Sequence, residues 1–300
     1  MSETDLARFR DVYNMQSPVA FPPRRVVSLV PSLTETLFDL QLGERVVAVT
    51  DYCIHPQAGL APLPRVGGIK NPDIEKIIAL QPDLVMMGRE ENRLGDAEQL
   101  RAAGIPIWVA HPRTVREALN MLWEIMYIFD EPAMVERVRW IERQLDWTEA
   151  VSRDTAPRRV FVPIWHNPWL VCSAHTYTHD LLRVCGGENV FAHMGVAEIP
   201  RSEDTPARPP AEQAVPYPQV TAVPYPQVTD EAILAAQPDV VLLPTEPYPF
   251  AEEHVQQIAA LDIPAAHEGR IHLIDGTLLT WYGTRLAYAL SEIPPLLAGI

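Results

Sequence analysis

Short apolar runs alternate with amphipathic stretches along the first part of the chain. Arg25–Val30 is a valine-rich run closed by Pro31, which is typical of a buried strand, and Arg45–Val49 is a second run of this kind. Between them, leucine and phenylalanine recur at helical spacing as far as Gly43. The same pattern predicts a helix, a strand, a helix and a strand over residues 73–80, 83–87, 96–103 and 105–109. Such alternation is typical of βαβ units with a mainly parallel sheet.

The middle of the chain breaks this alternation. Apolar residues recur at helical spacing over 114–129 and again over 131–152, with no strand between them. Residues 159–164 then restart the strand–helix pattern. The length of 300 residues is enough for about two domains. We therefore predict an N-terminal arm, an N-terminal lobe, a linking helix and a C-terminal lobe over residues 1–24, 25–130, 131–155 and 156–300.

The second lobe repeats a segment of the first. Residues 75–87 and 231–243 are identical at seven of thirteen positions, and both contain the sequence Gln-Pro-Asp between a helical stretch and an apolar run. Each segment begins with a glutamate, Glu75 in one and Glu231 in the other. The repeat favours two pseudo-equivalent lobes over a common turn that occurs twice.

A second repeat is of another kind. Residues 214–221 are copied without change as 222–229, and the unit Ala-Val-Pro-Tyr-Pro-Gln-Val-Thr contains two prolines. So short a unit has no core of its own. We expect residues 195–229 to be a loop insertion that carries this tandem octapeptide.

Composition excludes several classes of protein. The net charge of −15 would repel a phosphate backbone, so we expect no nucleic-acid partner, and no apolar run is long enough to span a membrane. The first residues lack the apolar stretch of a secretory signal, which predicts a cytoplasmic protein from the sequence as it stands. Cys53, Cys172 and Cys185 have no metal-type spacing, so free thiols are expected.

Four segments, in this order and spacing, resemble one family of binding proteins: Val30–Glu35, Asn71–Glu75 with Gln81–Asp83, Val184–Phe191 and Val223–Thr229. They resemble the substrate-binding proteins of ABC importers, in the group known as helical backbone metal receptors. The resemblance implies an α/β fold with two Rossmann-like lobes, joined by a single long helix and enclosing a ligand cleft. It also implies a monomer, periplasmic or surface-anchored, with no covalent cofactor. The ligand would be cobalamin or another corrinoid, haem or a ferric siderophore.

The same resemblance implies a role for the two repeated glutamates. In the exported members, each lobe carries an exposed glutamate that docks onto arginines of the ABC permease, and Glu75 and Glu231 match those positions. The alternative is that both are simple helix-start acids, which the helix dipole favours.

Ligand-binding candidates come from the resemblance and from chemistry. Tyr52 and Tyr225 match ligand-contacting positions of the family, whereas Ile69 stands where its B12-binding member has tryptophan. Aromatic faces suit planar ligands, and arginines suit carboxylates or amides. The full set of candidates is Ser32, Tyr52, Arg93, Trp165, Tyr225, Trp281, Tyr282 and Arg285. For each aromatic residue the alternative is ordinary packing.

Two other functions stay open at this point. His175 and His179 are four residues apart and His166 lies nearby, so direct Zn or Mn binding is one alternative, although no HExxH pattern is present. The other is a cytoplasmic enzyme or chaperone for tetrapyrroles or corrinoids on the same fold. The sequence contains no GxSxG elbow, Walker loop or GxGxxG motif, so we expect a protein without catalytic activity.

Overall fold

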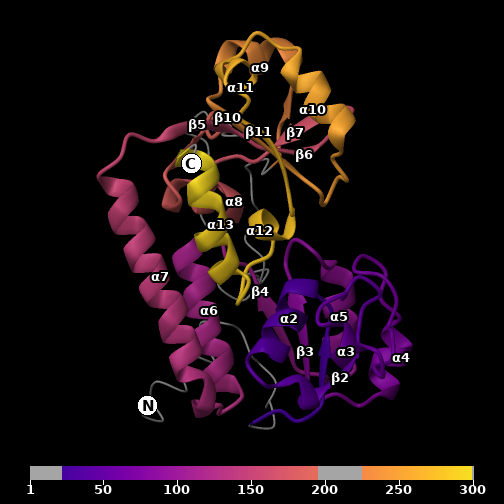
Figure 1. The fold of residues 1–300 in the computed structure, drawn as a ribbon. Coiled ribbons are helices and arrows are strands. Elements are labelled where there is room, and N and C mark those ends of the chain that lie inside the picture. The colour runs from indigo at the N-terminus through magenta and orange to yellow at the C-terminus, as the bar shows by residue number, and fades with distance from the viewer. Residues whose placement is uncertain (1–21, 195–224, 299–300) are drawn as a thin grey trace, which may run out of the picture.

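Two parallel four-stranded sheets organise the chain (Figure 1). The computed structural model describes residues 22–194 and 225–298. In the N-terminal lobe, β1 (Val26–Ser28), β2 (Val46–Val49), β3 (Leu84–Gly88) and β4 (Ile107–Ala110) pair in the order β2-β1-β3-β4. The helices of this lobe are α2 (Pro31–Asp39), α3 (Gln57–Leu60), α4 (Ile74–Ala79) and α5 (Leu94–Ala102), with a short 3-10 helix η1 (Gly43–Arg45). All three strand pairings are parallel, as the alternation predicts.

The C-terminal lobe repeats this arrangement. Its sheet has the order β11-β10-β5-β8, from β5 (Arg158–Phe161), β8 (Gly187–Asn189), β10 (Val240–Pro244) and β11 (Ile271–Ile274), again with parallel pairs. The helices are α8 (Tyr177–Val184), α9 (Asp230–Ala236), α10 (Glu252–Ala259), α11 (Pro264–His267), α12 (Thr277–Thr280) and α13 (Leu286–Ala298). The prediction of two α/β lobes with mainly parallel sheets is therefore confirmed.

The predicted strand over 159–164 is wrong in one respect. The chain leaves the parallel sheet after Phe161, and β6 (Pro163–Trp165) pairs instead with β7 (Trp169–Val171) in a small antiparallel sheet. The third strand of that sheet is β9 (Gln227–Val228), which lies in the stretch expected to be a loop. It forms because Val228 packs into the apolar core with Trp169. The first octapeptide copy lies outside the described residues.

The long helices join the lobes along one side of the molecule (Figure 1). α6 (Val115–Ile128) is followed by the 3-10 helix η2 (Pro132–Met134) and by α7 (Val135–Arg153), which carries the chain from the lower lobe to the upper one. α6 and α13 both pack against α7. One buried apolar cluster runs from α2 through these helices to α8, so the two lobes share a continuous core.

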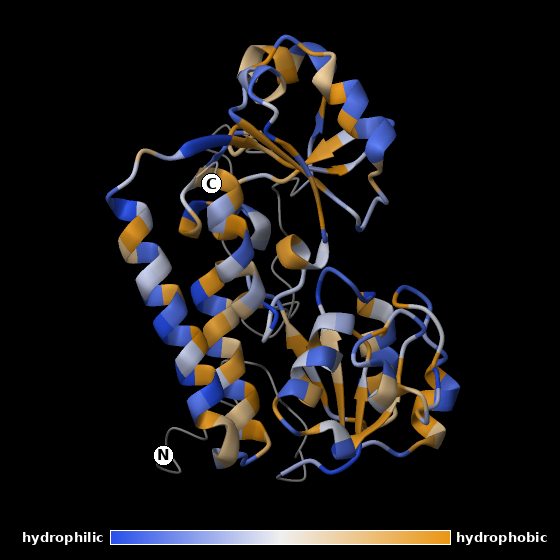
Figure 2. Cartoon of the chain, viewed as in Figure 1, coloured by the Kyte–Doolittle hydropathy of each residue, from blue (hydrophilic) through white to orange (hydrophobic). Residues whose placement is uncertain are grey.

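Figure 2 shows how this core follows from the sequence. The central strands are largely hydrophobic, whereas α7 alternates hydrophobic and hydrophilic residues along its length. On α7 the residues Val138, Ile141 and Leu145 are fully buried, at the spacing of one helix face. No helix in the described ranges is long and apolar enough to cross a membrane.

The internal repeat is also a structural repeat. Gln81 and Gln237 both adopt a positive φ, 48° and 43°, an uncommon conformation for residues other than glycine. The aspartates of the two Gln-Pro-Asp turns make matching contacts. A carboxylate oxygen of Asp83 accepts from Arg25 N at 3.0 Å, and a carboxylate oxygen of Asp239 accepts from Arg159 N at 3.0 Å. The same turn thus ends α4 and α9 and starts β3 and β10.

Candidate functional site

A cavity of about 260 Å³ lies between the lobes, at the carboxyl ends of their strands. This is where ligands bind in open α/β sheets. The N-terminal lobe contributes the residues that follow β3 and β4, and the C-terminal lobe contributes residues from β6, α8 and α12 and from the segments around them. The polar and aromatic residues that line it are Glu90, Glu91, His111, Tyr177, Thr178, Tyr225, Thr280 and Tyr282.

Two tyrosine–glutamate pairs cross this cavity from one lobe to the other. The Tyr225 hydroxyl donates to Glu90 Oε2 at 2.6 Å, and the Tyr282 hydroxyl donates to Glu91 Oε1 at 3.0 Å. Burial raises the pKa of Glu91 to about 7, against smaller opposing effects of a main-chain hydrogen bond and of the hydrogen bond from Tyr282. Burial also raises the pKa of Tyr225 and Tyr282, and the neighbouring carboxylates add to it, so both phenols keep their protons.

Tyr225 and Tyr282 are therefore two predicted ligand residues that line the cavity. Ser32 is a third predicted ligand residue. It is buried in the first turn of α2, and its side chain lies beside Tyr282. Tyr52 is exposed and lies near Gly68, in the turn that precedes Lys70. Arg93 is exposed at the start of α5 and borders a separate small cavity of about 120 Å³.

Trp165 belongs to an aromatic cluster beside the cavity. Its ring lies 5.3 Å from that of Tyr248, edge to face, and Trp165 is 44% exposed. Both residues directly follow a residue that lines the cavity, Ile164 and Pro247 respectively. The indole of Trp165 is therefore partly exposed, in a cluster whose members are next in sequence to residues of the cavity.

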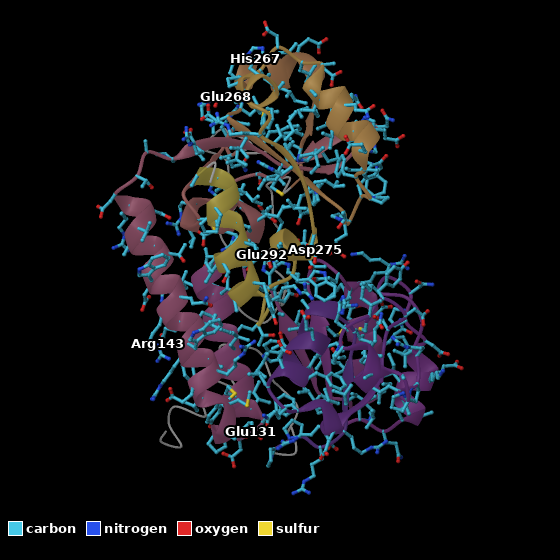
Figure 3. The ribbon with its side chains drawn as sticks, in the orientation of Figure 1. Glu131, Arg143, His267, Glu268, Asp275 and Glu292 are labelled. Atoms are coloured by element: carbon cyan, nitrogen blue, oxygen red, sulfur yellow. The ribbon has the colours of Figure 1, made fainter. Side chains whose placement is uncertain are left out.

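Trp281 and Arg285 lie at a different contact between the lobes. The guanidinium of Arg285 forms an ion pair with Glu35 of α2 and stands 5.2 Å from the centre of the Trp281 ring. Trp281 is buried and meets the ring of His55 of the N-terminal lobe edge to face, at 6.1 Å. Asp275, a further partner of Arg285, is labelled in Figure 3 where the upper lobe meets the lower one.

The histidines do not converge. His166 lies in the aromatic cluster, 4.3 Å from the ring of Trp169, while His175 and His179 lie at the start of α8. Burial lowers the pKa of His166 and of His179, so both are mainly neutral at pH 7. Across residues 22–194 and 225–298, no group of three or more His, Cys, Asp or Glu side chains could hold a metal ion.

A larger cavity of about 590 Å³ includes His179, but the N-terminal lobe contributes nothing to it. Its lining comes from α7, α8, β8 and the residues next to them. The cleft cavity, by contrast, is lined by both lobes. Because residues of both lobes line it at the carboxyl ends of their strands, the smaller cavity is the candidate site.

The two glutamates of the cavity were not among the residues predicted from the sequence. Glu90 and Glu91 follow the buried strand β3 directly, the position at which side chains reach the cleft of a parallel sheet. That rule singled out Arg93, two residues further on, because an arginine suits an anionic ligand. His111, Thr178 and Thr280 also line the cavity and carried no distinctive motif.

The two repeated glutamates lie on different lobes. Glu75 is in the first turn of α4 and Glu231 in the first turn of α9, and both side chains are exposed. Their helices start in the same way, because Asp73 accepts from Lys76 N at 2.9 Å and Thr229 accepts from Ala232 N at 3.3 Å.

Comparisons with known proteins match this chain to binding proteins. A family profile described as periplasmic binding protein matches residues 26–277. The vitamin B12-binding protein of Vibrio parahaemolyticus is 27% identical over 221 residues, which cover 73% of this chain and 70% of that protein. That of Yersinia pestis is 28% identical over 223 residues, with coverages of 73% and 69%.

Solved structures share the fold. The periplasmic vitamin B12-binding protein of Vibrio cholerae superposes with a TM-score of 0.70 at 23% identity, covering 93% of this chain and 98% of its own. The periplasmic haem-binding protein of Roseiflexus sp. RS-1 gives 0.69 at 22% identity, with coverages of 92% and 98%. These neighbours are binding proteins, not enzymes.

Proposed function

The chain belongs to the periplasmic binding protein family, and from this we propose that it captures a metal chelate in the cleft between its lobes for ABC-type uptake. A cobalamin-like corrinoid is the first candidate, with haem or a ferric siderophore as alternatives. The observation that carries the proposal is the cavity at the carboxyl ends of both sheets, bridged by Tyr225–Glu90 and Tyr282–Glu91.

The size of the cavity suits part of a large ligand. Sites that enclose a drug-sized molecule measure roughly 300–1,000 Å³. A cavity of about 260 Å³ therefore takes an edge of a planar chelate rather than the whole of it. Trp165 and Tyr248, beside the cavity, would pack against the face of the ligand.

The predicted residues divide into three groups in this proposal. Tyr225 and Tyr282 contact the ligand inside the cavity, Trp165 contacts it at the rim, and Ser32 positions Tyr282. Trp281 and Arg285 hold the lobes together, since the guanidinium is engaged by Glu35. Two further residues, Tyr52 and Arg93, are exposed on the N-terminal lobe and would contact only a ligand large enough to extend over it.

The arrangement of the helices supports capture with little movement. α7 carries the only crossing between the lobes within residues 22–194, and α6 and α13 pack against it. The buried cluster that these helices share would have to be broken for a wide opening. We therefore expect small closure motions, with Glu75 and Glu231 held at a nearly fixed separation for docking on a permease.

Calorimetric titration tests the proposal. The full chain is titrated separately with cyanocobalamin, haemin, ferrioxamine B and zinc. We expect one chelate to bind per chain with a Kd at or below about 1 μM, which corresponds to a binding free energy of about −8 kcal/mol. Stoichiometric zinc binding with no binding of any of the three chelates would contradict the proposal and favour a direct metal-binding protein.

A further inference from the structure

Four hydroxyl groups that line the cleft cavity, those of Thr178, Tyr225, Thr280 and Tyr282, have their protons directed at the protein. Tyr225 donates to Glu90 Oε2 and Tyr282 donates to Glu91 Oε1. A phenol has one proton and two lone pairs. With its proton engaged, each phenol can offer an occupant of the cavity only an acceptor oxygen.

The hydroxyl protons of the two threonines that line the cavity are also engaged by protein oxygens. Thr178 Oγ1 donates to the main-chain oxygen of Leu279 at 3.0 Å. Thr280 Oγ1 lies 2.9 Å from Glu246 Oε1 and 3.0 Å from the main-chain oxygen of Gly276, so its single proton goes to one of these acceptors. Tyr177 also borders the cavity, but its hydroxyl oxygen is buried. It therefore presents no accessible donor.

The charged side chains that line the cavity, among the described residues, are acidic and also favour a ligand that donates hydrogen bonds. Within the part of the chain that the structure describes, the residues that line it include two carboxyl groups, Glu90 and Glu91, and neither lysine nor arginine. His111 lies with Nε2 3.8 Å from Glu90 Oε1, and burial lowers its pKa, so at pH 7 it is mainly neutral and contributes one ring N–H but no charge. Lys70 does not border the cavity; its ammonium group binds the main-chain oxygen of Glu90.

Arginine is the residue that would normally receive a carboxylate in such a cleft. One predicted arginine, Arg285, has its guanidinium bound by Glu35, by Thr277 Oγ1 at 2.8 Å and by Asp275 at 3.4 Å. It does not line the cavity.

On the basis of the proposed function, we infer that the cavity receives the edge of a chelate that carries hydrogen-bond donors, such as primary amide or ammonium groups, and discriminates against chelates whose edge carries carboxylates. An amide N–H group would donate to the carboxyl oxygens of Glu90 and Glu91 and to the phenol oxygens. A carboxylate would meet the acidic groups of Glu90 and Glu91, and no lysine or arginine among the described lining residues would offset them.

The inference selects among the candidate ligands by their chemistry. A corrin ring that bears amide side chains meets the requirement, whereas a porphyrin with two free propionates does not. A ferric siderophore meets it only when its periphery carries amide or ammonium groups. The central metal and the ring size play no part in this selection.

Three matched pairs of probes test it by calorimetry at pH 7.5. The pairs are cyanocobalamin and a monocarboxylate made from it by hydrolysis of one amide, haemin diamide and haemin, and ferrioxamine B and its N-succinyl derivative. Each pair keeps the chelate and exchanges a donor group for a carboxylate, two such groups in the case of haemin. In every pair that binds, we expect the donor-bearing form to bind at least about tenfold tighter, the effect of one hydrogen bond to a charged group.

Variants then assign the effect to the cavity. Glu90→Gln and Glu91→Gln keep the shape of the side chains and remove the acid, so each should reduce the preference within a pair at least about threefold. Glu98→Gln, an exposed acid on α5, is the matched control and should leave the preference unchanged.

The outcomes separate this inference from the proposed function. If a carboxylate form binds as tightly as its partner, or if Glu90→Gln and Glu91→Gln leave the preference intact, the inference is overturned while the proposed function stands. If no member of any pair binds, the proposed function is overturned and the inference falls with it.

Discussion

Arg285 and Glu35 form a bidentate ion pair between the C-terminal segment and the N-terminal lobe. Arg285 Nε donates to Glu35 Oε2 at 2.7 Å, and Nη2 donates to Oε1 at 2.6 Å. The two side chains are only 13% and 11% exposed. Next to them, Thr284 Oγ1 donates to Asp39 Oδ2 at 2.8 Å. The chain thus returns after its second lobe and binds α2 of the first.

Removing one partner of this pair should destabilise the protein. Arg285→Ala leaves the buried Glu35 carboxylate without its cation, which typically costs about 3–5 kcal/mol. Urea unfolding of the variant should show a loss of at least about 2 kcal/mol. Arg139→Ala removes the exposed pair with Glu136 and should change the free energy of unfolding by less than about 0.5 kcal/mol.

A double variant distinguishes lost pairing from lost packing. Glu35→Leu combined with Arg285→Leu replaces both charges by apolar groups and should lose less than the sum of the two single changes. Strict additivity, or a loss at Arg285→Ala as small as that at Arg139→Ala, would show that the pair does not hold the lobes together.

Glu124 should make stability depend on pH. It is a buried residue of α6 whose Oε1 has no hydrogen-bond partner within the described ranges. Burial raises its pKa from 4.5 to about 7, an effect that Trp108 only partly offsets. Because the folded chain holds this proton more tightly than the unfolded chain, the contribution of Glu124 to stability falls as the pH rises from about 4.5 to 7.

Glu124→Gln removes this titration. The free energy of unfolding of the variant, relative to wild type, should be higher at pH 8 than at pH 4.5 by up to about 3 kcal/mol. Urea unfolding at the two pH values measures the difference. Glu91 titrates over the same range in both proteins, so it cancels in the comparison. An equal effect of the substitution at both pH values would rule out a proton held by Glu124.

Trp165 should contribute to ligand affinity without contributing to the core. Trp165→Ala is expected to weaken cyanocobalamin binding by about tenfold, through loss of an exposed aromatic face at the rim. Trp147→Ala is the matched control, because Trp147 lies on α7 and is 69% exposed. Fluorescence titration compares the two, and equal affinities for both variants would place the ligand away from the rim.

Glu75 and Glu231 should affect transport but not capture. Replacing both by alanine leaves the cavity intact, so the Kd for cyanocobalamin should stay within about twofold of wild type. Stimulation of ATP hydrolysis by a reconstituted vitamin B12 permease should fall at least about tenfold, since a charge contact is lost on each lobe. Glu98→Ala controls for an exposed helix acid. Undiminished stimulation by the double variant would leave these glutamates as helix-start acids only.

Much of the fold could be predicted because local signals agree with the tertiary structure. The repeated Gln-Pro-Asp sequence predicted equivalent turns, and Gln81 and Gln237 share the same backbone conformation. The linking helix followed from a helical pattern without an intervening strand, and α7 lies inside the predicted range. β6 could not be foreseen in the same way, because an apolar run does not say which strand it will pair with.

The site was only partly predictable. Tyr225 and Tyr282 were reached through their similarity to family positions and their aromatic character, and both line the cavity. Glu91 was passed over because its environment, not its sequence neighbours, raises its pKa. The pairing of Arg285 with Glu35 joins residues 250 positions apart, and no local sequence pattern predicts a contact over that separation.

The central claim is that a metal chelate binds between the lobes, with its edge in the Glu90–Glu91 cavity. The most direct measurement is the anomalous diffraction of cobalt in crystals of the full chain grown with cyanocobalamin. We predict one cobalt site per chain, between the lobes and beside Trp165, with the corrin edge against the two glutamates. A cobalt site elsewhere, such as the cavity between α7 and α8, would contradict the claim.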